Sequence, residues 1–296
     1  MAHDGLGAMT KQNALDAFQS FLKNAGLKKS PGFHIVLGSG FGAALDHVGG
    51  DHWRLKSELS FSEIPGLPHS TVQDHAGKFR AYENAKGQSA IFQLGRIHGY
   101  EGHAARDVVL PVMLARLSGI TNFFLTNAAG GVSSAFNAGD AMIIRDQVNM
   151  TGQNPLVGEN PLGPDKLPLG PRFPDMGNAY DPKWRADLKT ILSGAGLRVH
   201  EGIYMGLLGP SFETPAEVTL FNSWGIHAVG MSTVWETIAL KHSGARVAGL
   251  SLISNAAAGL GDGAPLDHTK ILETCRVSAA RIMGGVLNWL EKEMPV

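Results

Sequence analysis

A stretch near the middle of the chain, ITNFFLTNAAGGV (residues 120–132), joins an apolar run to a polar amide and then to residues with very small side chains. Phe123, Phe124 and Leu125 favour a buried β-strand, because aromatic and aliphatic side chains pack well on a pleated surface. Asn127 and the Ala-Ala-Gly-Gly run after it leave the backbone open, so a flat or compact ligand can lie closely against it. We therefore predict a strand at 122–126 with a ligand pocket at its end.

Segments with strand and helix patterns alternate on both sides of this stretch. We predict helices at 13–26, 105–118 and 182–193, strands at 33–38 and 141–145, and further alternating elements at 197–204, 215–223, 234–242, 246–253 and 267–289. KFRAY and SAIFQL, separated by residues 83–88, predict a β-hairpin, which makes the sheet mixed. Alternating strands and helices are typical of α/β proteins, so we predict a single domain over residues 1–296, with a central mixed β-sheet flanked by helices.

The composition narrows the classes of partner. The 296 residues carry a net charge of −1 without a long basic run, so we expect no binding to nucleic acid. No apolar run approaches the roughly 20 residues that span a bilayer, and the first residues, MAHDGLGAMTKQ, lack a signal-peptide pattern. We therefore expect a cytoplasmic protein without a membrane partner. Cys275, the one cysteine, permits neither an internal disulfide nor a cysteine-based metal cluster.

Several familiar catalytic motifs are incomplete or absent in this sequence. GSGFG (residues 38–42) follows a strand, but a dinucleotide motif would need its third glycine at Ala43, and only Glu58 offers itself as the ribose-binding acid. The chain contains no P-loop motif, no G-x-S-x-G elbow and no H-E-x-x-H. The sequence therefore argues against dinucleotide, P-loop, serine hydrolase and zinc protease chemistry.

Two short segments suggest an anion site instead. Ser39 lies in a glycine turn whose backbone N–H groups can point at an oxyanion, although a plain tight turn would use the same residues. GRIHGYEGH (residues 95–103) places Arg96, His98 and Tyr100 on one side of an extended chain. A guanidinium beside an imidazole makes a credible anion clamp, and the alternative is an exposed loop with incidental charges. His75 and His268 stand alone, and a lone histidine is more often structural.

Three strand endings suggest one shared pocket. VGMST (residues 229–233) and SLISNAAAG (251–259) repeat the change from apolar to polar and small residues that follows Thr126. The segment 158–174 contains five prolines, and we expect it to be a functional flap or an intersubunit contact.

The chain resembles the purine nucleoside phosphorylases of the trimeric, low-molecular-mass class. The similarity rests on VLGSGFG, STVQDHAGK, GRIHGYEG, TNAAGG, RFPDM, GPSFETPAE, AVGMSTV and SLISN, which follow in family order from residue 36 to 255. The resemblance implies that phosphate attacks C1′ of a purine nucleoside and releases the free base and ribose 1-phosphate. It implies no metal and no organic cofactor, only inorganic phosphate as co-substrate.

The resemblance also implies roles for individual residues. Phosphate would be held by Ser39, Arg96, His98, the backbone of Ala128, and Ser232, with His75 covering it. The ribose would be held by Tyr100, Met231 and His268. The base pocket, next to Asn127, would contain Glu213, Asn255, Phe212 and Gly130, with Tyr204 close by. Phe173 would reach over the ribose of a neighbouring subunit, which implies a homotrimer. We expect Asn255, Glu213 and His98 to act in catalysis.

The implied chemistry fits these residue types. Cleavage of an N-glycosidic bond builds positive charge on the sugar and negative charge on the leaving base, so phosphate stabilises the first and a hydrogen-bonding residue such as Asn255 the second. The Asn255 amide would accept from a protonated N7 and donate to a 6-oxo group, and the Glu213 carboxylate would accept from N1–H. Both contacts favour hypoxanthine and guanine over adenine, and a site built for such bonds can discriminate by about 10⁴.

Two alternative functions remain open at this stage, and one residue departs from the family pattern. A 5′-methylthioadenosine phosphorylase would share the fold and the phosphate site, and a non-catalytic purine or phosphate binder would not need Asn255. Trp235 stands after GMSTV, where many members of the family have proline. A large ring there would either close part of the pocket or pack in the interior.

Overall fold

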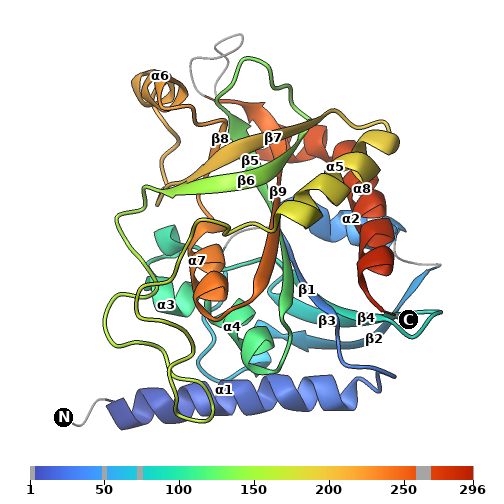
Figure 1. The fold of residues 1–296 in the computed structure, drawn as a ribbon, viewed down its shortest axis with the longest axis vertical. Helices are drawn as coiled ribbons and strands as arrows, with labels where there is room; N and C mark the ends of the chain where they lie inside the picture. Colours follow the sequence, from blue (N-terminus) through green and yellow to red (C-terminus); the bar gives the residue numbers. More distant parts are fainter. Residues whose placement is uncertain (1–3, 49–51, 72–75, 258–267, 296) are drawn as a thin grey trace.

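The computed structural model describes residues 4–48, 52–71, 76–257 and 268–295. Over these ranges the strands form one nine-stranded mixed sheet in the order β2-β3-β4-β1-β5-β8-β7-β6-β9 (Figure 1). The strands are β1 Phe33–Leu37, β2 Trp53–Ser60, β3 Lys78–Asn84, β4 Ser89–Leu94, β5 Asn122–Gly131, β6 Ala141–Asn149, β7 Val199–Gly206, β8 Ala228–Gly230 and β9 Arg246–Ala256. Because β9 pairs with β5 as well as with β6, the strands from β5 to β9 close into a ring. The predicted α/β class is confirmed.

Helices cover both faces of this sheet. They are α1 Asp4–Asn24, α2 Phe41–Val48, α3 Ala105–Val108, α4 Leu110–Leu117, α5 Pro182–Gly194, α6 Pro215–Ser223, α7 Val234–His242 and α8 His268–Glu293. One core lies under α2, α5 and α8, and the other under α1, α3, α4 and α7 (Figure 1). Alternate side chains of a strand reach the two cores, as in β5, where Phe124 faces the first and Phe123 and Leu125 face the second. None of these helices, as far as the structure describes them, is long and apolar enough to cross a membrane.

Most predicted elements are present, and some differ in extent. β3 and β4 form the predicted antiparallel hairpin, with Gly87 at a positive φ of 73° in the turn. The helix predicted at 105–118 is divided into α3 and α4 around Val109. Pro111 lies in the first turn of α4, where its missing N–H and its ring prevent the preceding helix from continuing. The strand β2 and the helix α2 were not predicted.

The prediction that the central strand ends at Thr126 is wrong. β5 continues to Gly131, pairing with β9 along its whole length and with β8 at its end. The alanines and glycines of TNAAGG are therefore strand residues rather than a loop after the strand. Their small size lets the backbones of β8, β5 and β9 meet closely, and the open floor that we predicted is the end of the strand itself.

Candidate active site

The turn between β1 and α2 lies directly against β5. The N–H of Gly38 donates to Thr126 Oγ1 at 3.1 Å, and a Cβ atom at Gly38 would lie only 2.7 Å from the Thr126 carbonyl oxygen. No side chain fits there, which explains the first glycine of GSGFG. Ser39 follows at the entrance to α2, so its hydroxyl and the first N–H groups of the helix lie at one place. A helix N-terminus of this kind favours a bound anion.

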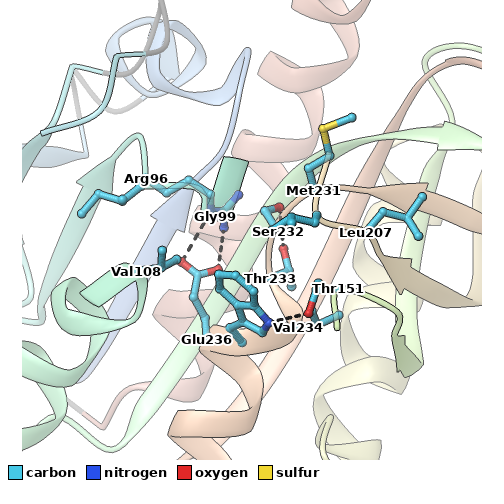
Figure 2. A pocket seen from close by; sticks show the side chains of 13 residues that line it. Arg96, Gly99, Val108, Thr151, Leu207, Met231, Ser232, Thr233, Val234 and Glu236 are labelled. Carbon is cyan, nitrogen blue, oxygen red and sulfur yellow. Dashed lines mark hydrogen bonds and ion pairs between the residues drawn. The ribbon is translucent and has the colours of Figure 1, made fainter. Parts of the chain in front are cut away.

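Arg96 extends from the end of β4 to this turn. Its Nη1 donates to the Thr126 carbonyl oxygen at 2.7 Å and would lie 3.0 Å from a Cβ on Gly38. Its Nη2 forms a salt bridge with Glu236 Oε2 at 3.2 Å, and both side chains are buried, with 3% and 4% of their surface exposed (Figure 2). A buried guanidinium held by a carboxylate and a carbonyl has a fixed orientation, as an anion clamp requires.

The segment after Arg96 is less extended than we predicted. Gly99–Glu101 forms a 3-10 turn, η2, so the simple alternation of Arg96, His98 and Tyr100 on an extended chain is wrong. The turn brings the rings of His98 and Tyr100 into a stack, with centroids 4.7 Å apart and planes at 14°. The two side chains still lie side by side, but they do so because the chain turns at Gly99.

Glu101 fixes the imidazole of His98. Its Oε1 accepts from the His98 backbone N–H at 2.8 Å and lies 3.2 Å from His98 Nδ1, while its other oxygen accepts from Thr71 Oγ1 at 2.8 Å. Burial alone would raise the pKa of the Glu101 carboxyl, but the hydrogen bonds from His98 and Thr71 outweigh it and lower the pKa to about 2. Burial lowers the pKa of His98 below its ordinary value, which favours the neutral ring.

Ser232 reaches the same place from the end of β8. Thr233 adopts φ 72° and ψ −45°, and the N–H of Val234 donates to the Ser232 carbonyl oxygen at 2.8 Å, which forms a strained γ-turn. Asn127 Nδ2 donates to Thr233 Oγ1 at 2.8 Å, and Thr233 Oγ1 lies 3.1 Å from Ser232 Oγ. Strain of this kind collects at functional sites, where surrounding contacts hold an otherwise unfavourable geometry. Asn127 therefore supports the turn that presents Ser232.

A second group of predicted residues meets at the C-terminal end of β5. Gly130 pairs in register with Asn255 of β9, and a Cβ on Gly130 would lie 3.7 Å from Asn255 Nδ2. The Asn255 amide is held by its neighbours, since Oδ1 accepts from Ser254 Oγ at 2.7 Å and Nδ2 donates to the Ala256 carbonyl oxygen at 2.7 Å. A purine would replace one or both of these local bonds with its own.

Glu213 and Phe212 lie between β7 and α6. Glu213 is buried and Phe212 half-exposed, and burial raises the pKa of the Glu213 carboxyl. Thr214 caps α6 with its side chain accepting from the N–H of Glu217, and Pro215 occupies the first turn. Thr214 and Glu217 therefore form the capping box of this helix. Met231 packs against Gly209 of the same connecting segment.

Of the four remaining predicted residues, the structure describes the side chains of two, Tyr204 and Phe173. Tyr204 is fully buried, and its hydroxyl accepts from the N–H of Ser232 at 3.4 Å, so it lies beneath the pocket wall rather than on its surface. Phe173 is 88% exposed and lines a separate cavity of about 500 Å³ with Arg172. His75 lies outside the described residues. His268 begins α8, and its side chain is outside the description.

Glu236 and Thr126 complete the clamp but were not predicted. Glu236 is 140 residues from Arg96 in the sequence, so no local pattern joins the two. One signal was available: a buried arginine needs a carboxylate, and Glu236 lies in the first turn of the mostly apolar segment 234–242. Ser39, Arg96, Asn127 and Ser232 thus come from four separate segments, and Thr126, Glu236 and Thr233 connect them.

Removal of Glu236 tests this arrangement through stability. Glu236→Ala leaves the Arg96 charge buried without its carboxylate, and we expect a loss of about 3–5 kcal/mol in the free energy of unfolding measured in urea. Glu58→Ala is the control, because Glu58 pairs with Lys78 and Arg80 on the surface and such pairs contribute only about 0–1 kcal/mol. Equal losses in the two variants would mean that the Arg96–Glu236 pair is not a buried anchor.

Glu101 gives a prediction about pH. Its pKa in the folded protein is about 2, below its ordinary value of 4.5, so its contribution to stability is full above 4.5 and is lost as the pH falls towards 2. Glu101→Gln should therefore reduce the free energy of unfolding most near neutral pH, and the difference from the original chain should shrink with falling pH. Glu159→Gln, on an exposed loop, is the control. A difference independent of pH would contradict the ionised role of Glu101.

Comparison with known proteins agrees with the fold. The model of the "Phosphorylase superfamily" matches residues 47–288, so the chain belongs to that family. The chain is 41% identical to purine nucleoside phosphorylase 1 of Geobacillus stearothermophilus, over 89% of this chain and 91% of that protein. It is 40% identical to the purine nucleoside phosphorylase of Mus musculus, over 76% of each chain.

Solved structures give the same result. The chain superposes on a schistosoma purine nucleoside phosphorylase in complex with hypoxanthine with a TM-score of 0.80 and 27% identity, covering 97% of this chain and 98% of that one. A Schistosoma mansoni purine nucleoside phosphorylase in complex with adenosine also superposes with a TM-score of 0.80. Within the superfamily this chain is thus an enzyme with purine nucleoside phosphorylase activity. The alternatives of a methylthioadenosine phosphorylase and of a non-catalytic binder are set aside.

Proposed function

We propose that this enzyme cleaves 6-oxopurine ribonucleosides and deoxyribonucleosides, such as inosine and guanosine, with inorganic phosphate. The products would be the free base and (deoxy)ribose 1-phosphate, in purine salvage. The observation that carries the proposal is the pairing of Asn255 with Gly130 on neighbouring strands, with the buried Glu213 in the segment before α6. An amide and a carboxylate match the N7, 6-oxo and N1–H groups of hypoxanthine and guanine.

The anion clamp supplies the other half of the reaction. Phosphate would be held by Ser39, Arg96, His98, Ser232 and the N–H of Ala128. Bound there, phosphate would approach C1′ as a nucleophile and stabilise the positive charge that develops on the ribose. Asn255 would stabilise the negative charge on the departing base. No metal or organic cofactor is needed in this scheme, and no group of three His, Cys, Asp or Glu side chains in the described part of the chain is placed to hold a metal ion.

Two of the residues proposed to contact the ribose are Tyr100 and Met231. Tyr100 is stacked on His98, and Met231 packs against Gly209. Both would line the space between the clamp and the base pocket. His75 and His268 are proposed to cover the phosphate and to bind near the 5′-hydroxyl, respectively. We propose further that the whole chain, residues 1–296, acts as one domain and that the enzyme is cytoplasmic.

A single absorbance assay tests the proposed specificity. Inosine and adenosine are incubated with and without phosphate, and release of the free base is followed. We expect phosphate-dependent cleavage of inosine and at most slow cleavage of adenosine. Adenosine is included because a relative has been solved in complex with it. Efficient cleavage of adenosine would overturn the proposed roles of Asn255 and Glu213 and leave the phosphate clamp intact.

Phe173 supports a proposal about assembly. A phenylalanine that is 88% exposed next to Arg172 is unusual on a free surface, and it suits a contact with a neighbouring subunit of a homotrimer. In that arrangement Phe173 would cover the ribose in the site of the next subunit, and each site would be complete only in the oligomer.

Replacement of Phe173 tests that arrangement. Phe173→Ala should lower kcat/KM for inosine about tenfold, equivalent to about 1.4 kcal/mol, while sedimentation shows an unchanged oligomer. Leu167→Ala is a matched control, because Leu167 is exposed on the same loop without adjoining Phe173. A fully active monomer in sedimentation would refute the proposal.

A further inference from the structure

The side chain of Trp235 is buried beside Glu236 and the residues of the proposed anion clamp. Trp235 is the second residue of α7, next to Glu236 and three residues after Ser232, and 5% of its surface is exposed. With Gly99, Thr151 and Val234, which Figure 2 labels, Trp235 lines a cavity of about 20 Å³ that Arg96 and Ser232 also line. A cavity of this size holds about one water molecule, and the ring that lines it packs in the interior of the protein.

One edge of the indole is anchored to the turn after β6. Trp235 Nε1 donates to Thr151 Oγ1 at 2.9 Å. The same hydroxyl donates to Asn149 Oδ1 at 2.7 Å and accepts from the N–H of Gln153 at 3.1 Å. A hydroxyl has one hydrogen and two lone pairs, so these three bonds satisfy it completely. The indole is therefore held in one orientation by the turn of residues 149–153.

The opposite edge of the indole presses against Gly99. A Cβ atom on Gly99 would lie 2.5 Å from Cη2 and 2.8 Å from Cζ3 of Trp235, and 2.8 Å from Cδ1 of Leu208. Real Cβ atoms do not approach other atoms so closely. Gly99 is not among the glycines with positive φ, so space rather than backbone conformation excludes a side chain there. Gly99 stands between His98 and Tyr100 and begins η2.

We propose that Trp235 is a positioning residue for phosphate, through which the turn of residues 149–153 holds the His98–Tyr100 turn in place. The inference rests on the proposed role of Arg96 and His98 in phosphate binding. The indole ring packs against Gly99 at the start of η2. Glu236, the next residue in the chain, forms the salt bridge that orients Arg96. No described contact joins Trp235 to Asn255 or Glu213, so its effect falls on phosphate rather than on the base.

Four variants test the support that Trp235 gives. Trp235→Leu removes the ring, Trp235→Phe removes mainly the N–H donor, Thr151→Val removes the acceptor with little change of shape, and Gly99→Ala pushes the η2 turn away from the ring. We expect Trp235→Leu and Gly99→Ala to raise the phosphate KM about tenfold, below the roughly 10²-fold cost of a 1 Å misplacement. The inosine KM should stay within about twofold, since a residue that acts on one substrate changes one constant.

The double variant Gly99→Ala with Trp235→Leu identifies the contact. Because the smaller side chain makes room for the new methyl group, we expect its phosphate KM to lie below that of Gly99→Ala alone. Trp224→Leu is the matched control, since Trp224 is 52% exposed on the surface and its loss should leave both constants unchanged. Thr151→Val and Trp235→Phe, which disturb packing least, should raise the phosphate KM by a smaller factor in the same direction.

The outcomes separate this inference from the proposed function. If Trp235→Leu lowers only the melting temperature and leaves the phosphate KM at its original value while Arg96→Ala raises it, Trp235 is structural and the inference fails with the clamp intact. If the double variant is additive, there is no contact-mediated coupling and the inference fails as well. If Arg96→Ala also leaves the phosphate KM unchanged, the phosphate site is placed wrongly and both proposals fall.

Discussion

Asn255→Asp should shift the preference of the enzyme from inosine towards adenosine. An amide can accept from N7–H and donate to a 6-oxo group, whereas an aspartate carboxylate only accepts. The carboxylate would match the 6-amino group of adenine and oppose the oxygen of hypoxanthine. Each mismatched buried group costs about 1–3 kcal/mol. With a loss for one base and a gain for the other, the ratio of kcat/KM should change by about 30-fold to 10⁴-fold.

The measurement compares kcat/KM for inosine and adenosine at saturating phosphate. Asn222→Asp, which makes the same exchange on the exposed face of α6, is the matched control and should leave the ratio unchanged. Glu213 still accepts from N1–H in the Asn255→Asp variant, so adenosine should not become as good a substrate as inosine was. An unchanged ratio of the two specificity constants would refute the assignment of Asn255 to the base.

The sequence predicts most of the fold because strands buried between two cores consist of continuous apolar runs. Residues 33–37 and 122–126 show this pattern, and the observed strands β1 and β5 begin where it begins. Pro182 and Pro215 open α5 and α6 at the predicted positions, since proline suits the first turn of a helix. Local propensity and tertiary packing agree in these elements.

The elements that were missed or given wrong bounds are those where local propensity and tertiary packing disagree. β2, WRLKSELS, is polar and mostly exposed beyond Trp53, because it pairs only with β3 at the edge of the sheet. The end of β5 consists of alanine and glycine, residues with little strand preference. It is a strand because β8 and β9 supply hydrogen-bonding partners, a contact between distant segments that propensity cannot show.

The residues of the candidate site also fall into a predicted group and a missed group. The motifs and the family resemblance suggested residues for the proposed substrate contacts, but not the residues that hold these side chains in place. Glu236 and Thr126 fix Arg96, and Thr233 presents Ser232 through a strained backbone. These supports depend on burial and on the register of three strands, so they become visible only when the chain is folded.

Arg96→Ala should have the largest effect on phosphate binding. The variant removes charge-assisted hydrogen bonds, each worth about 1.5–3 kcal/mol. It also leaves the buried carboxylate of Glu236 next to the proposed phosphate position, and like charges there would repel each other. Together these effects should raise the phosphate KM by about 10²-fold to 10⁴-fold, with a far smaller change for inosine. Initial rates at varied phosphate and fixed inosine, and the reverse, give both constants.

The double variant Arg96→Ala with Glu236→Ala separates the two causes. Without the carboxylate, the repulsion disappears, so the phosphate KM should fall below that of Arg96→Ala while staying above that of the original enzyme. Arg80→Ala is the control. Arg80 lies on β3 and forms salt bridges with Glu58 and Asp46, so its loss should change neither the phosphate KM nor the inosine KM. Equal increases in the KM for phosphate and for inosine would show that Arg96 supports the fold of the whole pocket. In that case the buried pair would be a structural anchor, and the anion would have to be held by Ser39, His98 and Ser232 without it.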